Sequence, residues 1–283
     1  MEKFIIIVLS IVLSGLFFFS AQVLAADKPE RWVVYYGEAL PAERFLPYDL
    51  VVFDSQKSPP LRPLMNRDKT LLGYLSIGEA EKYRHDYKRI EEMGALLEEN
   101  PDWPGHYIVD IRNPQWIKYL IEVKIPEILH KNFDGVMLDT LDSALYLWEK
   151  DKEKYAGMDS AAINLLATIR KHYPDITVML NRGFHVLPEV APFIDKVLAE
   201  SIMVNFKTSS KQPEYFSESV TQEYEGIIDE AKKQNPALKL YSLDYWPPED
   251  TAKVKDIYQI QRARGYIPYV TTIELMQEHE EPR

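Results

Sequence analysis

The sequence predicts an α/β fold, a single (β/α)8 barrel, from two observations. Eight short apolar runs alternate with helical patterns, as expected of βα units that build a parallel sheet. Nearly every run stops on a polar, acidic or aromatic residue, and barrels of this class carry their functional groups at the C-terminal ends of the strands. Eight strands in this alternation favour a closed barrel over an open sheet. The expected strands are Trp32–Tyr36, Leu50–Phe53, Leu71–Leu75, Gly135–Leu138, Thr177–Leu180, Lys196–Ala199, Leu238–Leu243 and Tyr266–Val270.

Helical patterns fill most of the connections, and one connection is unusually long. About sixty residues separate the third expected strand from the fourth, and they include a helical pattern over Ile90–Glu99. A connection of that length is usually a functional elaboration at the active face. Trp103 and Trp116 in this region are expected to pack in the core or against helices. The other expected helices are Trp116–His130, Ser160–His172, Tyr215–Gln234 and Thr251–Arg264.

The N-terminus predicts export. Phe4–Leu24 is nearly all apolar, and Val23 and Ala25 occupy the −3 and −1 positions of a cleavage site. We therefore expect residues 1–25 to be a signal peptide cleaved after Ala25, which predicts a secreted or periplasmic protein. The stretch is also long enough to span a bilayer, so an uncleaved segment would anchor the protein in a membrane. Residues 26–283 then form one barrel domain, which we expect to be a monomer.

Composition narrows the classes of partner. The chain has 283 residues, a formal net charge of −11 and no cysteine. Without cysteine there is neither a disulfide framework nor a lipid-modified N-terminus. The acidic balance, with no basic stripe, argues against a nucleic-acid partner. It suits a cationic substrate, although acidity is also common in exported proteins for the sake of solubility.

Polar residues at the strand ends supply the candidate site. Asp139 and Asp142 follow the fourth strand and Glu200 follows the sixth, and two facing carboxylates are the minimum for glycoside hydrolysis. Crowded carboxylates shift one another's pKa, so that one stays protonated while another is ionised. Aromatic and amide groups beside them suit a sugar, and the excess of carboxylates favours a cationic amino sugar. The candidate substrate-binding residues are Tyr36, Asp54, Ser76, Glu79, Arg84, Asp110, Asn181, Arg182, Asp244 and Tyr245.

Structural roles compete with these assignments. An aspartate after a strand is often a turn residue or a helix cap, and this alternative carries equal weight for Asp54. Arg84 and Arg182 could serve only to pair with the acids. Motifs for a cysteine or serine nucleophile, a phosphate loop, a dinucleotide fold or a zinc protease are absent. We therefore expect no cofactor and no metal, with a carboxylate-only metal site as the weaker alternative.

Several segments resemble a known family. Leu75–Arg84 (LSIGEAEKYR), Phe133–Asp142, Leu180–Gly183 and Ala199–Ser201 are similar to motifs of the family 114 glycoside hydrolases, and Asp244-Tyr245 fits the same pattern. The resemblance spans most of residues 32–272, with the motifs in the family's order. It implies a (β/α)8 barrel that hydrolyses partially deacetylated α-1,4-linked galactosamine polymer with retention of configuration.

The resemblance also implies catalytic roles. The family's catalytic aspartate falls on Asp139 or Asp142 and its catalytic glutamate on Glu200. Asp142 is the preferred nucleophile, with Asp139 binding the sugar and Glu200 as acid/base. Two rival hypotheses remain, a carbohydrate-binding barrel without turnover and a hydrolase of a different polysaccharide, because substrate subsites lie on the loops that vary most.

Overall fold

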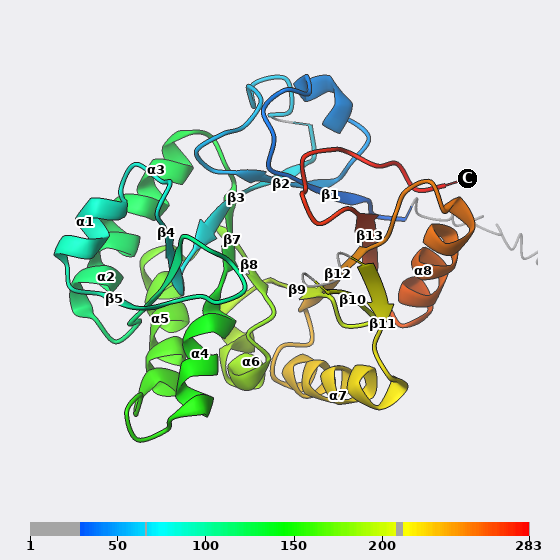
Figure 1. The fold of residues 1–283 in the computed structure, drawn as a ribbon. Helices are drawn as coiled ribbons and strands as arrows, with labels where there is room; N and C mark the ends of the chain where they lie inside the picture. The colour runs from blue at the N-terminus through cyan, green and yellow to red at the C-terminus, as the bar shows by residue number, and fades with distance from the viewer. Residues whose placement is uncertain (1–28, 66, 208–211, 283) are drawn as a thin grey trace, which may run out of the picture.

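A sheet of eight parallel strands forms the centre of the molecule (Figure 1). The computed structural model describes residues 29–65, 67–207 and 212–282. All eight expected strands are present, within two residues of the expected bounds, and the predicted barrel is confirmed. In their order around the sheet they are β1 (Trp32–Tyr35), β2 (Leu50–Asp54), β3 (Thr70–Ser76), β7 (Gly135–Asp139), β8 (Thr177–Asn181), β9 (Lys196–Glu200), β12 (Lys239–Tyr245) and β13 (Ile267–Thr271).

The sheet curves until its first and last strands meet. β1 lies against β13, and beyond the strands the Tyr36 N–H donates to the Leu275 carbonyl at 2.8 Å. The register places Ser76 of β3 beside Asp139 of β7, and Glu200 of β9 beside Leu243 of β12. The C-terminal ends of neighbouring strands therefore lie level with one another, which gathers the strand-end side chains at one rim.

Burial on both faces explains why the strands read as continuous apolar runs. Val33, Val51 and Val136 have no exposed surface, as expected of a parallel sheet wrapped by helices. The approach of β8 to β7 is close enough to require glycine at one point. A Cβ on Gly135 would lie 1.9 Å from the Thr177 carbonyl oxygen.

Helices cover the outside of the barrel. Of the four helices expected besides Ile90–Glu99, three are present as single elements, and the one expected over Trp116–His130 is divided by a π turn. Pro126 has no N–H to donate to the preceding turn, and the wider turn lies just before it. The helical elements are η1 (Ala42–Phe45), α1 (Tyr87–Glu92), α2 (Pro114–Tyr119), η2 (Leu120–Lys124), α3 (Ile125–His130), α4 (Leu141–Lys150), α5 (Met158–His172), η3 (Phe184–Val186), α6 (Leu187–Val190), η4 (Ala191–Phe193), α7 (Glu218–Gln234) and α8 (Thr251–Ala263).

The long connection differs from the expectation. The prediction that Ile90–Glu99 is helical is wrong beyond Glu92, where α1 ends. Gly94 adopts a φ of +64°, a left-handed conformation that stops the helix, and the chain continues as the strand β5 (Leu96–Glu99). β5 joins β4 (Glu79–Glu81) and β6 (His106–Val109) in a small antiparallel sheet with the order β4-β6-β5.

A second elaboration follows β9. The strands β10 (Val204–Lys207) and β11 (Gln212–Tyr215) pair antiparallel as a hairpin. Figure 1 shows this hairpin and the β4-β6-β5 sheet on different sides of the barrel mouth. None of the helices within the described ranges is long and apolar enough to cross a membrane. The expected signal peptide and its cleavage after Ala25 lie outside the described residues.

Candidate active site

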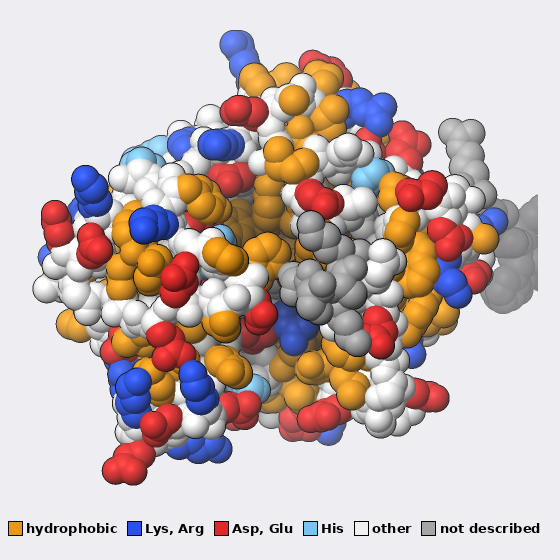
Figure 2. Space-filling model, viewed as in Figure 1, with side chains coloured by type: hydrophobic (Ala, Val, Ile, Leu, Met, Phe, Trp, Pro, Cys, Tyr) orange, Lys and Arg blue, Asp and Glu red, His pale blue; other side chains and the backbone are white. Residues whose placement is uncertain are grey.

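A cleft of about 950 Å³ opens at the C-terminal ends of the barrel strands. Its walls include both elaborations, with Trp103 and His106 on one side and Asn205 and Phe216 on the other. The same face is hollowed near its centre in the space-filling view (Figure 2). Ten of the thirteen predicted site residues line the cleft: Tyr36, Asp54, Glu79, Arg84, Asp139, Asp142, Asn181, Arg182, Glu200 and Tyr245.

Three adjacent strands deliver the residues at the floor. β7 ends on Asp139, β8 on Asn181 and β9 on Glu200. Each of these residues is followed by a non-glycine residue in the left-handed region, with φ of +68° at Thr140, +53° at Arg182 and +51° at Ser201. Such conformations are uncommon for residues with side chains and concentrate at functional sites. They turn the chain away directly after each functional side chain.

The Asn181 amide joins the two central carboxylates. Its Nδ2 donates to Oδ1 of Asp139 at 2.8 Å and to Oε2 of Glu200 at 2.5 Å. These two distances total 5.3 Å, so the two acceptor oxygens lie no farther apart than that. With both amide hydrogens directed at acids, the buried Oδ1 of Asn181 has no partner among the described residues.

One of these carboxyl groups holds a proton to unusually high pH. Burial, reinforced by the negative charge of Glu200, raises the pKa of Asp139 to about 7. Hydrogen bonds from Asn181 and the Thr140 N–H oppose the rise without cancelling it. Near neutral pH the Asp139 carboxyl, which Asn181 joins to Glu200, is therefore only partly ionised.

Two tyrosines adjoin the pair. The Tyr245 hydroxyl donates to Oε1 of Glu200 at 2.5 Å, so both carboxylate oxygens of Glu200 accept hydrogen bonds. Burial and the charge of Glu200 raise the pKa of Tyr245 well above its usual value. Tyr36 shows the same direction, because burial and the charges of Asp139 and Glu200 raise its pKa. Both phenols therefore stay protonated, and Tyr245 uses its proton to donate to Glu200.

Asp142 has a different environment from Asp139. Its Oδ2 accepts from Nε of Arg182 at 2.7 Å and its Oδ1 accepts from the Gly183 N–H at 2.8 Å. Arg182 also donates to the carbonyl oxygen of Glu200 at 2.7 Å, and its guanidinium lies over the Phe184 ring. Asp142 thus orients an arginine that connects the starts of the loops after β7, β8 and β9.

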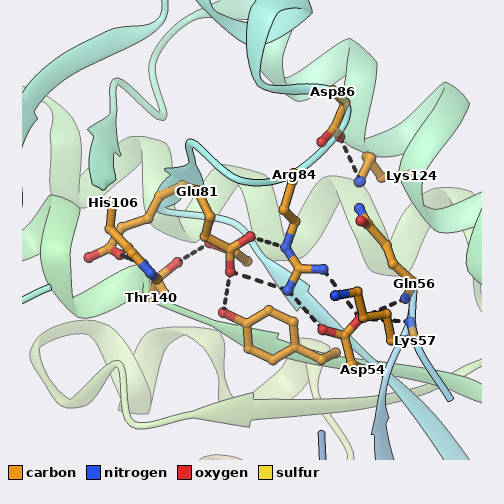
Figure 3. Close-up of polar contacts among 12 residues, drawn as sticks. Asp54, Gln56, Lys57, Glu81, Arg84, Asp86, His106, Lys124 and Thr140 are labelled. Carbon is orange, nitrogen blue, oxygen red and sulfur yellow. Dashed lines mark hydrogen bonds and ion pairs between the residues drawn. The ribbon is translucent and has the colours of Figure 1, made fainter. Parts of the chain in front are cut away.

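A second acidic group lies on the β2–β4 side of the cleft (Figure 3). Arg84 pairs with both oxygens of Asp54, at 3.2 and 3.1 Å, and with Glu81. Asp54 also accepts the N–H groups of Gln56 and Lys57, so it serves the turn and the ion pair together. Glu81 itself is a wall residue that the predicted site set lacks.

Glu79 lies at the centre of a third network. It accepts hydrogen bonds from Asn100 at 2.7 Å, from His106 at 3.1 Å and from Ser143. Burial by itself would raise the pKa of Glu79, but these hydrogen bonds outweigh it and lower the pKa. The hydrogen bond to Glu79 raises the pKa of His106. Asn100 and His106 were not predicted, because nothing in the sequence shows that the inserted sheet folds over the barrel.

Three predicted residues do not line the cleft. Asp244 has no exposed surface and accepts from Gln261 of α8 at 2.6 Å, because successive residues of a strand face opposite ways and Tyr245 takes the inner face. Asp110 pairs with Arg112 at 2.8 Å, beyond the end of β6. Ser76 hydrogen-bonds the Glu79 carbonyl and the Thr140 hydroxyl, so it holds the loop that bears Glu79.

The expectation that Trp103 packs in the core or against helices is wrong. It is 46% exposed and lines the cleft, whereas Trp116 is buried as expected.

Acidic side chains outnumber basic ones in the cleft. Of the described residues, nine carboxylate side chains line it, against three from lysine and arginine. No cluster of three or more His, Asp or Glu that could hold a metal occurs in the described part of the chain.

Comparisons with known proteins agree with this geometry. Residues 20–281 match glycoside-hydrolase family GH114. An uncharacterised protein of Deinococcus radiodurans is 25% identical over 262 residues, covering 87% of this chain and 81% of that protein. An uncharacterised protein of Thermotoga maritima is 24% identical over 298 residues, covering 95% and 90% of the two chains.

Two solved structures share the fold. The glycoside hydrolase domain of PelA from Pseudomonas aeruginosa superposes with a TM-score of 0.79 at 24% identity, over 90% of this chain and 99% of that domain. Ega3 of Aspergillus fumigatus, solved in complex with galactosamine, superposes with a TM-score of 0.64 at 14% identity, over 87% of this chain and 92% of that one.

Proposed function

From the premise that the chain belongs to glycoside-hydrolase family GH114, we propose that it is an exported, retaining endo-hydrolase of an α-1,4-linked polymer of galactosamine and N-acetylgalactosamine. The observation that carries the proposal is the pair formed by Asp139 and Glu200, which share the Asn181 amide. The two carboxyl oxygens that accept hydrogen bonds from Asn181 lie within 5.3 Å of each other. Retaining enzymes hold their two carboxyl groups about 5–5.5 Å apart, whereas inverting enzymes leave about 6.5–9.5 Å for a water.

Asp139 is the nucleophile in this proposal. Only its Oδ1 accepts hydrogen bonds within the described residues, so Oδ2 is available to attack the anomeric carbon. Asp142 has both oxygens engaged by Arg182 and Gly183, which suits a positioning role. The geometry thus favours Asp139 over Asp142, the reverse of the preference drawn from the motif.

Glu200 is the acid/base. In the bound complex it gives a proton to the leaving oxygen, and Asp139 attacks as the carboxylate. Once Glu200 has given up the proton, hydrogen bonds from the Asn181 amide and the Tyr245 hydroxyl stabilise its carboxylate. In the second step Glu200 takes a proton from water, which hydrolyses the glycosyl–Asp139 ester and restores the pair.

The charge of the cleft supports an amino-sugar substrate. Among the described residues of the cleft, nine carboxylates against three lysine and arginine side chains attract ammonium groups. The structural similarity to Ega3 in complex with galactosamine points to the same sugar.

Export is the remaining part of the proposal. It rests on the apolar Phe4–Leu24 segment and the small residues before Ala26. N-terminal sequencing of the protein purified from the producing cells tests it. A chain that begins at Ala26 outside the cytoplasm supports export, and a membrane-bound chain that retains Lys3 identifies an anchor.

Incubation with purified polysaccharides tests the activity. We expect new reducing ends from partially deacetylated α-1,4-galactosamine polymer, and none from chitosan, which has β-linkages. Cleavage of an unrelated polysaccharide alone would assign a different substrate. Tight binding to the galactosamine polymer without new reducing ends would identify a carbohydrate-binding barrel.

A further inference from the structure

A second, apolar pocket adjoins the cleft beside Glu200. Its volume of about 420 Å³ lies in the range of ligand sites, and Trp103, Tyr245, Ile273 and Glu274 belong to both cavities. It lies between the loop before β6, the hairpin β10–β11 and the loops after β12 and β13. Its lining is Trp103, Phe206, Gln212, Pro213, Tyr245, Trp246, Pro247, Pro248, Glu249, Thr272, Ile273 and Glu274.

The chemistry of this pocket is the reverse of the cleft floor. Three aromatic rings besides Tyr245, three prolines and Ile273 line it, and no lysine or arginine of the described residues does. Its two carboxylates, Glu249 and Glu274, are exposed side chains. Trp246 is fixed in place, because its Nε1 donates to Asp250 at 3.2 Å and its ring lies 5.5 Å from that of Tyr215. The pocket therefore has an apolar wall with a charged rim.

Tyr245 connects the pocket to the chemistry. Its hydroxyl donates to Glu200, while its ring lies 6.5 Å from the Phe206 ring in an edge-to-face arrangement. Because Tyr245 lines both cavities, a polymer bound across the catalytic pair has a route past it into this pocket. An ammonium group placed against the apolar wall would lose water without gaining a buried partner. An acetamido group would place its methyl on the aromatic wall, in a pocket that the polar side chains of Gln212 and Thr272 also line.

We propose that this pocket is a subsite for an N-acetylated sugar, so that the enzyme selects a cleavage point with an acetylated unit in the apolar pocket and free amines in the acidic cleft. The proposal rests on the proposed function, because it assumes that one polymer occupies both cavities. In this proposal the acetylated unit is recognised by Trp246, Phe206 and Ile273, none of which belongs to the catalytic pair.

Binding of single sugars tests the pocket independently of cleavage. Saturation-transfer NMR with N-acetylgalactosamine should show the strongest transfer at the acetamido methyl. Trp246→Ala and Phe206→Ala, two residues that line this pocket and not the cleft, should each reduce that transfer at least threefold, with galactosamine binding unchanged. Tyr146→Ala is the matched control, because Tyr146 is an exposed aromatic residue on α4 that lines neither cavity. Unchanged methyl transfer in both pocket variants, or no binding of N-acetylgalactosamine, would overturn the proposal.

Product mapping on partially acetylated polymer provides the second readout. Mass spectrometry of wild-type products should find an acetylated unit enriched at one fixed position from the new ends. Trp246→Ala should lose this enrichment and roughly tenfold in kcat/KM on this polymer, with less than a threefold change on fully deacetylated polymer, since burial of a methyl and a ring edge is worth about one factor of ten. Equal losses on both polymers would refute selection of acetyl groups. Failure of the wild type on every galactosamine polymer would refute the proposed function and leave the binding test to decide on the pocket.

Discussion

Nε of Arg182 donates to Oδ2 of Asp142 at 2.7 Å, and this ion pair separates the roles of two aspartates only three residues apart. Asp139 points to the floor of the cleft, while Asp142 serves the arginine. Asp139→Asn should abolish polymer cleavage, because the amide is not a nucleophile. Asp142→Asn should keep at least a tenth of the activity and lose roughly 1–2 kcal/mol of stability, since it weakens a charged hydrogen bond. Initial rates and urea unfolding measure the two effects, and equal inactivation by both changes would contradict the assignment.

Glu200→Gln removes the proton donor and keeps the shape. We expect polymer cleavage to fall by about 10²–10⁴-fold, the usual contribution of general acid catalysis. An aryl galactosaminide with a good leaving group does not need protonation, so this variant should still release the aryl group in a burst and accumulate a glycosyl–Asp139 ester. Mass spectrometry of the quenched protein detects that adduct. The idea fails if the variant cleaves polymer at the wild-type rate.

The raised pKa of Asp139 predicts a cost in stability at high pH. The folded state keeps the proton up to about pH 7, whereas an unfolded aspartate loses it near pH 4. The folded state thus binds more protons between these values, and stability is complete below about pH 4 and declines as pH rises to about 7. Asp139→Asn removes this decline, so above pH 7 it should be more stable than wild type by on the order of 2–4 kcal/mol. Thermal melts from pH 4 to pH 8 provide the measurement, and a wild-type advantage at pH 8 would show the sign to be wrong.

Two glycines form a matched test of close packing at the site. A Cβ on Gly78 would lie 2.1 Å from the Thr140 carbonyl oxygen, next to Asp139, whereas a Cβ on Gly226 in α7 would meet nothing within 4 Å. Gly78→Ala should destabilise the protein by about 1–3 kcal/mol and lower kcat by displacing Thr140. Gly226→Ala should stabilise it by about 0.5–1 kcal/mol without changing kcat. Chemical unfolding and polymer assays on both variants distinguish local overpacking from a general effect of the extra methyl.

Apolar runs that end on polar residues predicted the barrel and most of its floor. Asp139, Asn181 and Glu200 were all predicted, because each directly ends a strand that is buried on both faces. Asp244 shows the limit of this reasoning. In Asp244-Tyr245 either residue could face inward, and only the register of β12 directs the acid toward α8.

The long connection was harder to predict, because its fold depends on tertiary contacts. A glycine with positive φ separated helix from strand near Ile90–Glu99, and the apolar spacing alone did not reveal it. Once β5 and β6 pair, Trp103 lies at their turn beside the cleft rather than in the core. Side chains such as His106 become functional only through this folding of the insertion over the barrel.

The excess of carboxylates in the cleft affects the rate at which a charged polymer associates with the protein. An acidic concavity on a chain of net charge −11 draws a polycation toward it before any contact forms, which raises the association rate. Dissolved salt shortens the reach of this attraction to about 8 Å at physiological ionic strength, while groups in contact within the cleft are screened much less. Added salt should therefore slow the capture of dilute polymer and leave turnover at saturation nearly constant, so that in saline surroundings the enzyme works best where its substrate is dense.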